Sequence, residues 1–263
     1  MYQSLYEPLP DAGAYLARIG YSHTPQINRD TLDELVLAHL THIPFENLDV
    51  FYLQQPVSLG IADLFDKVIT RRRGGYCFEL NGLFLSLLQS IGFSAYSVAA
   101  RVHMGKTFYP PLSHRGIIVT LEGERYFCDV GFGGPCPRTS LRLDDSSEQV
   151  VAGQIFRFQK RGSEFCLQLK KEDGWFALFS FTDVPVDSVD FIVLSGYACL
   201  NPQSAFRSKR MVYLLTPDAG RIALENNELR RTGCDPIQIN EPVELESALA
   251  KYFGIQLDSS FPL

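Results

Sequence analysis

The sequence predicts an α+β fold in three consecutive parts: an N-terminal helical bundle over residues 1–92, a central antiparallel β-barrel-like domain over 93–185 and a small C-terminal α/β lid over 186–263. Two observations predict it. Apolar residues recur at helical spacing through the first part, whereas from about Ser94 they fall in short runs separated by tight turns. Successive short strands of this kind favour an antiparallel sheet or barrel.

The first part is expected to hold four helices. Each has apolar residues on one face and a start or stop signal at its ends. They are expected from Asp11 to Gly20, from Asn28 or Asp30 to Pro44, over residues 58–72, and from Cys77 to Gly92. Pro44 ends the second helix because the residue before a proline is pushed out of the α region.

The second and third parts are expected to be richer in strands. In the second part we expect strands over 96–104, 115–121, 125–132, 154–159, 164–169 and 175–181. The run Glu122-Gly123-Glu124 between two of them indicates a hairpin. The third part is expected to contain a helix at 191–200, a strand at 211–215, a hairpin at 221–229 and a final helix at 242–252.

The composition is that of an ordinary globular protein. Its 263 residues are 46% hydrophobic and 21% charged, which is enough apolar material for a core. The net charge of −6 argues against a nucleic-acid-binding surface, since such surfaces are basic. The N-terminus lacks the basic and apolar regions of a secretory signal, and no apolar run has membrane-spanning length. We therefore expect a cytoplasmic protein without a nucleic-acid or membrane partner.

Cys77 is a candidate nucleophile because of its place in the first turn of a strongly amphipathic helix. Unpaired backbone N–H groups and the positive end of the helix dipole favour a thiolate there. The alternative is a small buried residue, which is what most free cysteines are. The six cysteines form no CxxC pair, and the five histidines do not cluster with them at ligand spacing. Neither a disulfide scaffold nor a metal site is therefore expected.

The predicted hairpin offers this thiol a base and an orienting acid. We assume that Glu122 and Gly123 form its turn. Asp129 then pairs with Gly116, and His114 lies diagonally opposite on the same face, about 7–8 Å away at Cα. Gly116 leaves room for the imidazole, whereas a one-residue slip would put acid and base on opposite faces. A His before a strand is more often solvated than catalytic, but an acid in an apolar strand indicates a paired role, structural or catalytic.

Several motifs resemble the arylamine N-acetyltransferase family, in the family's order and with similar spacing. They are Ile43-Pro44-Phe45-Glu46-Asn47-Leu48, Arg73-Gly74-Gly75-Tyr76-Cys77-Phe78-Glu79-Leu80-Asn81, His114, and Cys128-Asp129-Val130-Gly131-Phe132-Gly133. The resemblance implies a catalytic triad of Cys77, His114 and Asp129 in a core like that of cysteine proteases and transglutaminases. It also implies ping-pong acetyl transfer from acetyl-CoA, as co-substrate, to aromatic amines and hydrazines, without a metal, and a part in xenobiotic metabolism.

The same resemblance implies roles for residues around the triad. Phe45, Tyr76 and Phe132 would line the acceptor pocket, and Gly133 and Gly134 would lie near the CoA entrance. A glycine loop lets backbone N–H groups approach a ligand, although this one does not open a helix as a dinucleotide-binding motif does.

Three further residues are expected to support the nucleophile. We expect Arg73, with Glu46 and Asn47, to tie the loop before the cysteine to the second helix rather than to touch substrate. The match to the family is weaker in the C-terminal third, where it is carried by Pro202-Gln203-Ser204-Ala205-Phe206. The contacts to the acyl donor in that part are accordingly left open.

Three functional hypotheses follow. The first is an acetyl-CoA-dependent arylamine N-acetyltransferase. The second keeps the triad but uses another acyl donor, as an amide synthase or a cysteine hydrolase would. The third is a non-catalytic binding protein, and a complete triad counts against it. A hydrolase needs water at the acyl-enzyme, which an aromatic wall would exclude, so the first hypothesis is favoured over the second. The natural acceptor and the oligomeric state are not predicted.

Overall fold

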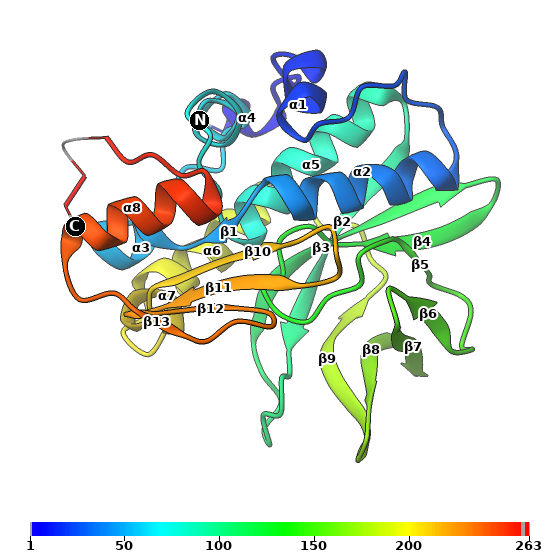
Figure 1. The fold of residues 1–263 in the computed structure, drawn as a ribbon. Coiled ribbons are helices and arrows are strands. Elements are labelled where there is room, and N and C mark those ends of the chain that lie inside the picture. Colours follow the sequence, from blue (N-terminus) through cyan, green and yellow to red (C-terminus); the bar gives the residue numbers. More distant parts are fainter. Residues whose placement is uncertain (1, 259–260, 263) are drawn as a thin grey trace.

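The computed structural model describes residues 2–258 and 261–262 and shows a mixed helix-and-sheet fold (Figure 1). Helices of the first part lie against an eight-stranded sheet, and a five-stranded sheet built mainly from the last part lies beside them. The predicted α+β class is therefore confirmed.

The helical segments of the first part largely follow the prediction. They are η1 (Gln3–Tyr6), α1 (Ala12–Arg18), α2 (Arg29–His42), α3 (Leu48–Leu53), α4 (Ile61–Phe65), η2 (Asp66–Thr70) and α5 (Cys77–Ile91). The predicted caps are confirmed, since the side chains of Asp11 and Asn28 accept backbone N–H groups at 2.9 and 2.8 Å. The predicted third helix divides into α4 and the π-helical turn η2. The short α3 escapes prediction because six residues are too few to show a period.

The first part packs around α5. Most of its side chains are buried, and it contacts α1 and α4 as well as strands β2 (Ser94–Val102) and β3 (Leu112–Leu121). Gly92 ends the helix in the left-handed conformation, with φ of 111°. Because α5 lies between other helices and the sheet, the N-terminal turn that carries Cys77 is held in the interior of the protein.

The central sheet has the strand order β5-β4-β3-β2-β9-β8-β7-β6. Its remaining strands are β4 (Glu124–Cys128), β5 (Leu141–Arg142), β6 (Gln149–Val151), β7 (Gln154–Arg161), β8 (Glu164–Lys171) and β9 (Gly174–Thr182). The two edge strands meet, because Arg142 and Gln149 exchange hydrogen bonds at 2.8 and 3.0 Å. The sheet is thus nearly closed around a phenylalanine-rich core, as the predicted barrel-like character requires.

The predicted register of the hairpin is confirmed, because Ile117 pairs with Cys128. Two details differ from expectation. β4 ends at Cys128, so Asp129 lies in the loop that follows rather than in a strand that continues to residue 132. A Cβ at Gly116 would lie 2.5 Å from Cε2 of Phe127. The glycine therefore makes room for this phenylalanine and not for the imidazole.

The last part forms the five-stranded sheet together with a strand from the first part. The order is β1 (Phe45–Glu46), β10 (Met211–Leu215), β11 (Arg221–Glu225), β12 (Glu228–Arg231) and β13 (Ile237–Gln238), with helices α6 (Asp190–Leu200), α7 (Ala205–Ser208) and α8 (Pro242–Phe253). Phe45 of β1 pairs with Tyr213 of β10, so the first and last parts share a sheet. The division into domains at residues 92 and 185 stays a prediction. No helix within the described residues is long and apolar enough to span a membrane.

Candidate active site

Cys77 is the first residue of α5, and its side chain is almost completely buried, with 3% of its surface exposed. The loop before it passes very close to the chain at Pro44. A Cβ at Gly74 would lie 1.9 Å from the carbonyl oxygen of Pro44, so no larger residue fits there. Phe45 forms an isolated bridge with Gly75. The double glycine therefore lets the loop pack directly against β1, and this packing fixes the start of α5, where Cys77 lies.

The imidazole of His114 and the carboxylate of Asp129 meet as the hairpin register predicts. His114 Nε2 lies 2.6 Å from Asp129 Oδ2, and both side chains are buried. With Nε2 bonded to the acid, Nδ1 is the other ring nitrogen. The thiol of Cys77 lines the same cavity as the imidazole, and its Sγ lies 3.8 Å from the carbonyl oxygen of Ser113. The structure thus brings thiol, imidazole and carboxylate together from a helix, a strand and a loop.

The electrostatics of this group favour a charged imidazole. Burial alone lowers the pKa of His114, but Asp129 and then Cys77 more than reverse this and raise it to about 10. The rings of Phe132 and Phe179 lie 5.2 and 5.3 Å from the imidazole, centroid to centroid, and shield it from water. A buried imidazolium beside the thiol is the state that this arrangement supports.

Asn81 belongs to the site although it is not among the predicted site residues. It lies one turn after Cys77 on α5 and is fully buried. Its Nδ2 donates to Asp129 Oδ1 at 2.8 Å and to the carbonyl of Arg115 at 2.6 Å, while its Oδ1 accepts the N–H of Val130 at 2.9 Å. A buried amide with every group bonded fixes its neighbours rigidly. Two features of the sequence pointed to it: its position at i+4 from the thiol and its place at the end of the motif around Cys77.

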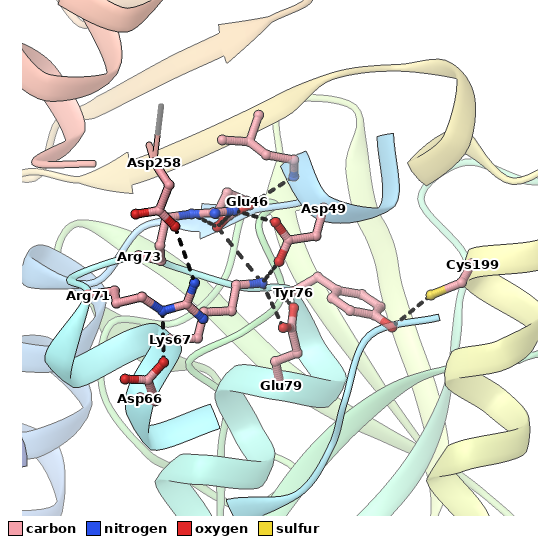
Figure 2. A network of polar contacts seen from close by, with 11 residues as sticks. Glu46, Asp49, Asp66, Lys67, Arg71, Arg73, Tyr76, Glu79, Cys199 and Asp258 are labelled. Carbon is pink, nitrogen blue, oxygen red and sulfur yellow. Dashed lines mark hydrogen bonds and ion pairs between the residues drawn. The ribbon is translucent and has the colours of Figure 1, made fainter. Parts of the chain in front are cut away.

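A buried network of charges supports the loop before Cys77 (Figure 2). Arg73 donates to Glu46 at 2.9 Å and to Asp49 at 2.8 Å, and Lys67 lies 2.6 Å from Asp49 and 2.8 Å from Glu79. Glu79 also accepts the backbone N–H that precedes Cys77, at 3.0 Å. The expected pairing of Arg73 with Glu46 is present, but it ties the loop to β1 and α3 and not to the second helix.

Asn47 has a different role from the one expected. It forms no hydrogen bond with Arg73 among the described residues. Its Nδ2 donates to the carbonyls of Phe206 and Lys209 at 2.8 Å each, and its Oδ1 accepts the N–H of Met211 at 2.8 Å. Asn47 therefore fastens α7 and β10 of the last part to the first part, one residue after the Arg73 partner Glu46.

A cavity of about 760 Å³ opens at the thiol and the imidazole. Of the predicted binding residues, Phe45, Phe132, Gly133 and Gly134 line it. Residues outside the prediction complete its wall, from the loop after β2, from α6 and α7, and from β10; among them are Met104, Lys106, Phe108, Tyr197, Phe206, Lys209, Met211 and Tyr213. The wall is mainly aromatic and apolar, with lysines as its cations, which suits an aromatic ligand in one part and an anionic one in another.

Tyr76 differs from the expectation, because it does not line this cavity. Its side chain is fully buried and points toward α6, as Figure 2 shows. Its hydroxyl lies 2.5 Å from Ser195 Oγ and 3.3 Å from Cys199 Sγ. The buried phenol therefore makes a structural contact with α6 in place of the expected contact with an acceptor.

No group of three or more potential metal ligands occurs within residues 2–258 and 261–262. The candidate site is therefore described by its own side chains: a thiol, an imidazole, a carboxylate and an amide, beside an aromatic cavity.

Comparisons with known proteins match this sequence and fold over most of the chain. A family model described as N-acetyltransferase matches residues 28–261. The arylamine N-acetyltransferase of Mycobacterium tuberculosis (strain ATCC 25618 / H37Rv) is 36% identical over 94% of this chain and 90% of its own, and that of Escherichia coli (strain K12) is 32% identical over 95% and 91%.

Solved structures agree with the sequence relatives. The arylamine N-acetyltransferase of Salmonella typhimurium superposes with a TM-score of 0.91 at 31% identity, covering 98% of this chain and 96% of that one. The Mycobacterium marinum enzyme in complex with CoA has a TM-score of 0.85 at 35% identity, with 93% of each chain covered. The fold is therefore that of an acyltransferase. The chain belongs to the arylamine N-acetyltransferase family, as its motifs indicated.

Proposed function

We propose that this N-acetyltransferase moves the acetyl group of acetyl-CoA to aromatic amines and hydrazines in two steps, through an acetyl-cysteine at Cys77. The observation that carries the proposal is that Cys77 lines an aromatic cavity together with His114, whose imidazole is bonded to Asp129. The related structure from Mycobacterium marinum, which is described in complex with CoA, supports a CoA thioester as the donor.

In the first step the Cys77 thiolate attacks the carbonyl carbon of the thioester. The bond between that carbon and the CoA sulfur breaks, and the departing sulfur takes the proton of the His114 imidazolium. The backbone N–H of Cys77 has no helical acceptor in the first turn of α5 and is placed to bind the developing oxyanion. The products are free CoA, acetyl-Cys77 and neutral His114.

In the second step the amine attacks the acetyl-cysteine. His114 takes a proton from the amine nitrogen, and the Cys77 thiolate leaves, which restores the starting thiolate–imidazolium pair. Asp129 holds Nε2 throughout and stabilises the charged ring. Phe45 and Phe132 are proposed to hold the aromatic acceptor, and Gly133 and Gly134 to lie beside the donor, whose phosphates Lys106 complements in charge.

The mass of the intact protein tests this proposal. Acetyl-CoA alone is expected to add about 42 Da, one acetyl group on a covalent intermediate. Addition of an aromatic amine should remove the label and form the N-acetyl product. Cys77→Ser should abolish the adduct. An intact enzyme without label would contradict the proposal, and rapid release of acetate in the absence of amine would favour a cysteine hydrolase. The same measurement with longer acyl-CoAs distinguishes an amide synthase.

A further inference from the structure

The loop that joins β2 to β3 forms part of the cavity wall. It covers residues 103–111, and Met104, Lys106, Phe108 and Pro111 line the cavity. The side chains of Met104 and Phe108 are 39% and 61% exposed, so their burial contributes little to holding the loop. Polar contacts with the neighbouring strands therefore matter for its position.

A tight turn fixes Lys106 relative to His103. The N–H of Lys106 donates to the carbonyl of His103 at 2.9 Å, and the two residues between them, Met104 and Gly105, have φ of 45° and 81°. Positive φ at both central positions is typical of a type I′ turn, which continues the twist of paired strands. A contact that holds His103 in place therefore holds Lys106 as well.

A chain of hydrogen bonds ties His103 to the central sheet. His103 Nε2 lies 2.8 Å from Oγ of Ser180 on β9, and this hydroxyl donates at 2.7 Å to Oε1 of Glu164, the first residue of β8. Because the single hydroxyl proton of Ser180 goes to the carboxylate, its oxygen accepts from the Nε2–H of the imidazole. Ser180 is buried, so a partner that it loses is costly to replace.

The same carboxylate holds the other end of the loop. The hydroxyl of Tyr109 donates to Glu164 Oε1 at 3.0 Å, and the guanidinium carbon of Arg101 lies 4.6 Å from the centre of the Tyr109 ring. Arg101 also donates to the carbonyl of Pro110 at 2.9 Å. Glu164 thus accepts hydrogen bonds that lead to both ends of loop 103–111.

Two lysines line the cavity, and they differ in their partners. Lys209 is paired with Glu225, whereas Lys106 takes part in none of the ion pairs between the described residues. The Nζ of Lys106 donates to the carbonyl of Val102 at 3.0 Å, which leaves two of its three protons for a ligand. Lys106 is therefore the residue of this loop whose charge suits the phosphates of the proposed donor.

We infer that Glu164 is a positioning residue for donor binding: its carboxylate holds loop 103–111, and with it Lys106, in place along the cavity. The inference rests on the proposed function, because it takes a CoA thioester as the donor. Glu164 itself does not line the cavity. Removal of its carboxylate should therefore weaken the binding of a donor that carries phosphates and leave the chemistry at the thiol unchanged.

The test is the concentration of acetyl-CoA that gives half the maximal rate of Cys77 labelling, followed by the mass of the intact protein. For Glu164→Ala we expect this concentration to rise about fivefold and the maximal rate to stay within about twofold of wild type, because only the loop loses hydrogen bonds. Glu164→Gln retains an acceptor oxygen and should restore the wild-type value. Glu124→Ala is the matched control, since Glu124 also begins a strand of the central sheet, β4, but binds the exposed Arg142.

Two further measurements show whether Glu164 acts through Lys106. Acetyl-pantetheine has the same thioester but no phosphate, so Glu164→Ala should change its half-saturating concentration by less than about twofold. Lys106→Met should raise the value for acetyl-CoA about tenfold. Adding Glu164→Ala to Lys106→Met should raise it little further, since the effects of residues that act through one contact are not additive.

Tyr109→Phe separates the attachment of the loop from folding. It removes one hydroxyl from a side chain that is 66% exposed, so the melting temperature should stay at that of wild type while the half-saturating concentration of acetyl-CoA rises about threefold. A wild-type value in Glu164→Ala or in Tyr109→Phe would overturn the inference. Equal changes with acetyl-CoA and acetyl-pantetheine, or fully additive effects of Glu164→Ala and Lys106→Met, would also overturn it. Failure of acetyl-CoA to label wild-type Cys77 would instead contradict the proposed function.

Discussion

At the scale of single residues, Asp129 forms hydrogen bonds through both of its carboxylate oxygens. One carboxylate oxygen takes the imidazole, and the other accepts from Asn81 at 2.8 Å and from the N–H of Gly131 at 2.9 Å. An acid bonded on both oxygens cannot rotate, so the imidazole it holds keeps one orientation toward the thiol. The orientation of the base is therefore set by a residue of α5, the same helix that carries the nucleophile.

Asn81→Ala is expected to lower kcat/KM for acetyl transfer by about a hundredfold, because Asp129 loses one of its anchors and small displacements of a catalytic pair are costly. The steady-state rate with acetyl-CoA and an aromatic amine measures the effect. Gln89→Ala serves as the control, since Gln89 is an exposed amide of the same helix that bonds only the carbonyl of Ala95. Equal activity in the two variants would contradict this role.

At the scale of elements, buried charges join β1, α3, η2 and the start of α5 (Figure 2). Three acids, Glu46, Asp49 and Glu79, face two bases, Lys67 and Arg73. Burial raises the pKa of Glu79 to about 7, and Lys67 acts against this shift. For Asp49, Lys67 and then Arg73 outweigh burial and lower the pKa to about 2. A cluster with one more acid than base favours one shared proton, which resides on Glu79.

The pH dependence of stability follows from the raised pKa of Glu79 and the lowered pKa of Asp49. The folded state holds the Glu79 proton more tightly than the unfolded chain, so this contribution is present below pH 4.5 and is lost as the pH rises through about 7. Asp49 has the opposite sign, and its contribution is lost only as the pH falls toward 2. We expect the melting temperature of wild type to fall by several degrees between pH 5 and 8 relative to Glu79→Gln.

Calorimetry across that pH range measures the difference. Glu172→Gln, an exposed glutamate in the turn between β8 and β9, should follow the wild-type curve. Parallel curves for wild type and Glu79→Gln would place the shared proton elsewhere in the network.

At the scale of the whole molecule, the cavity exists only because all three parts of the chain meet around it. Arg221 of β11 donates to the carbonyl of Gly133 at 2.7 Å and lies 4.1 Å from the centre of the Tyr213 ring. Tyr213 in turn stacks on Phe45, with ring centres 5.6 Å apart. The last part thus holds the glycine loop of the second part against an aromatic residue of the first.

Arg221→Met should release this loop and weaken the wall against which the acceptor is proposed to bind. A hydrogen bond from a charged donor contributes about 1.5–3 kcal/mol, so we expect the KM for an aromatic amine to rise about tenfold or more. Labelling of Cys77 by acetyl-CoA should change much less. Arg230→Met is the control, because Arg230 is exposed and pairs with Glu228 on its own strand. If Arg221→Met slowed only the labelling of Cys77 and left the KM for the amine unchanged, this role of Arg221 in acceptor binding would be contradicted.

The places where prediction from sequence succeeded depend on local chemistry. The helix starts at Asp11 and Asn28 were correct because a cap bonds only to its own first turn. The hairpin register was correct because a two-residue turn sets the pairing of its strands, and this register alone brought His114 and Asp129 together.

The places where it failed depend on partners far away in the chain. Tyr76 was expected in the acceptor pocket, but its hydroxyl forms a hydrogen bond with Ser195 of α6, 119 residues further along the chain. Asn47 was assigned to Arg73, yet its partners lie at residues 206–211. No spacing within a segment encodes which distant segment will cover it.

The sequence by itself determined the class of the fold, the boundaries of its main elements, and the hairpin register that pairs His114 with Asp129, because caps, turns and periodicity act over a few residues. The tertiary structure alone decided which side chains line the cavity, how Asn81 reaches Asp129, and how the last part closes over the first. Those outcomes follow from packing between elements, where burial and hydrogen-bond satisfaction are settled jointly by residues that are remote in sequence.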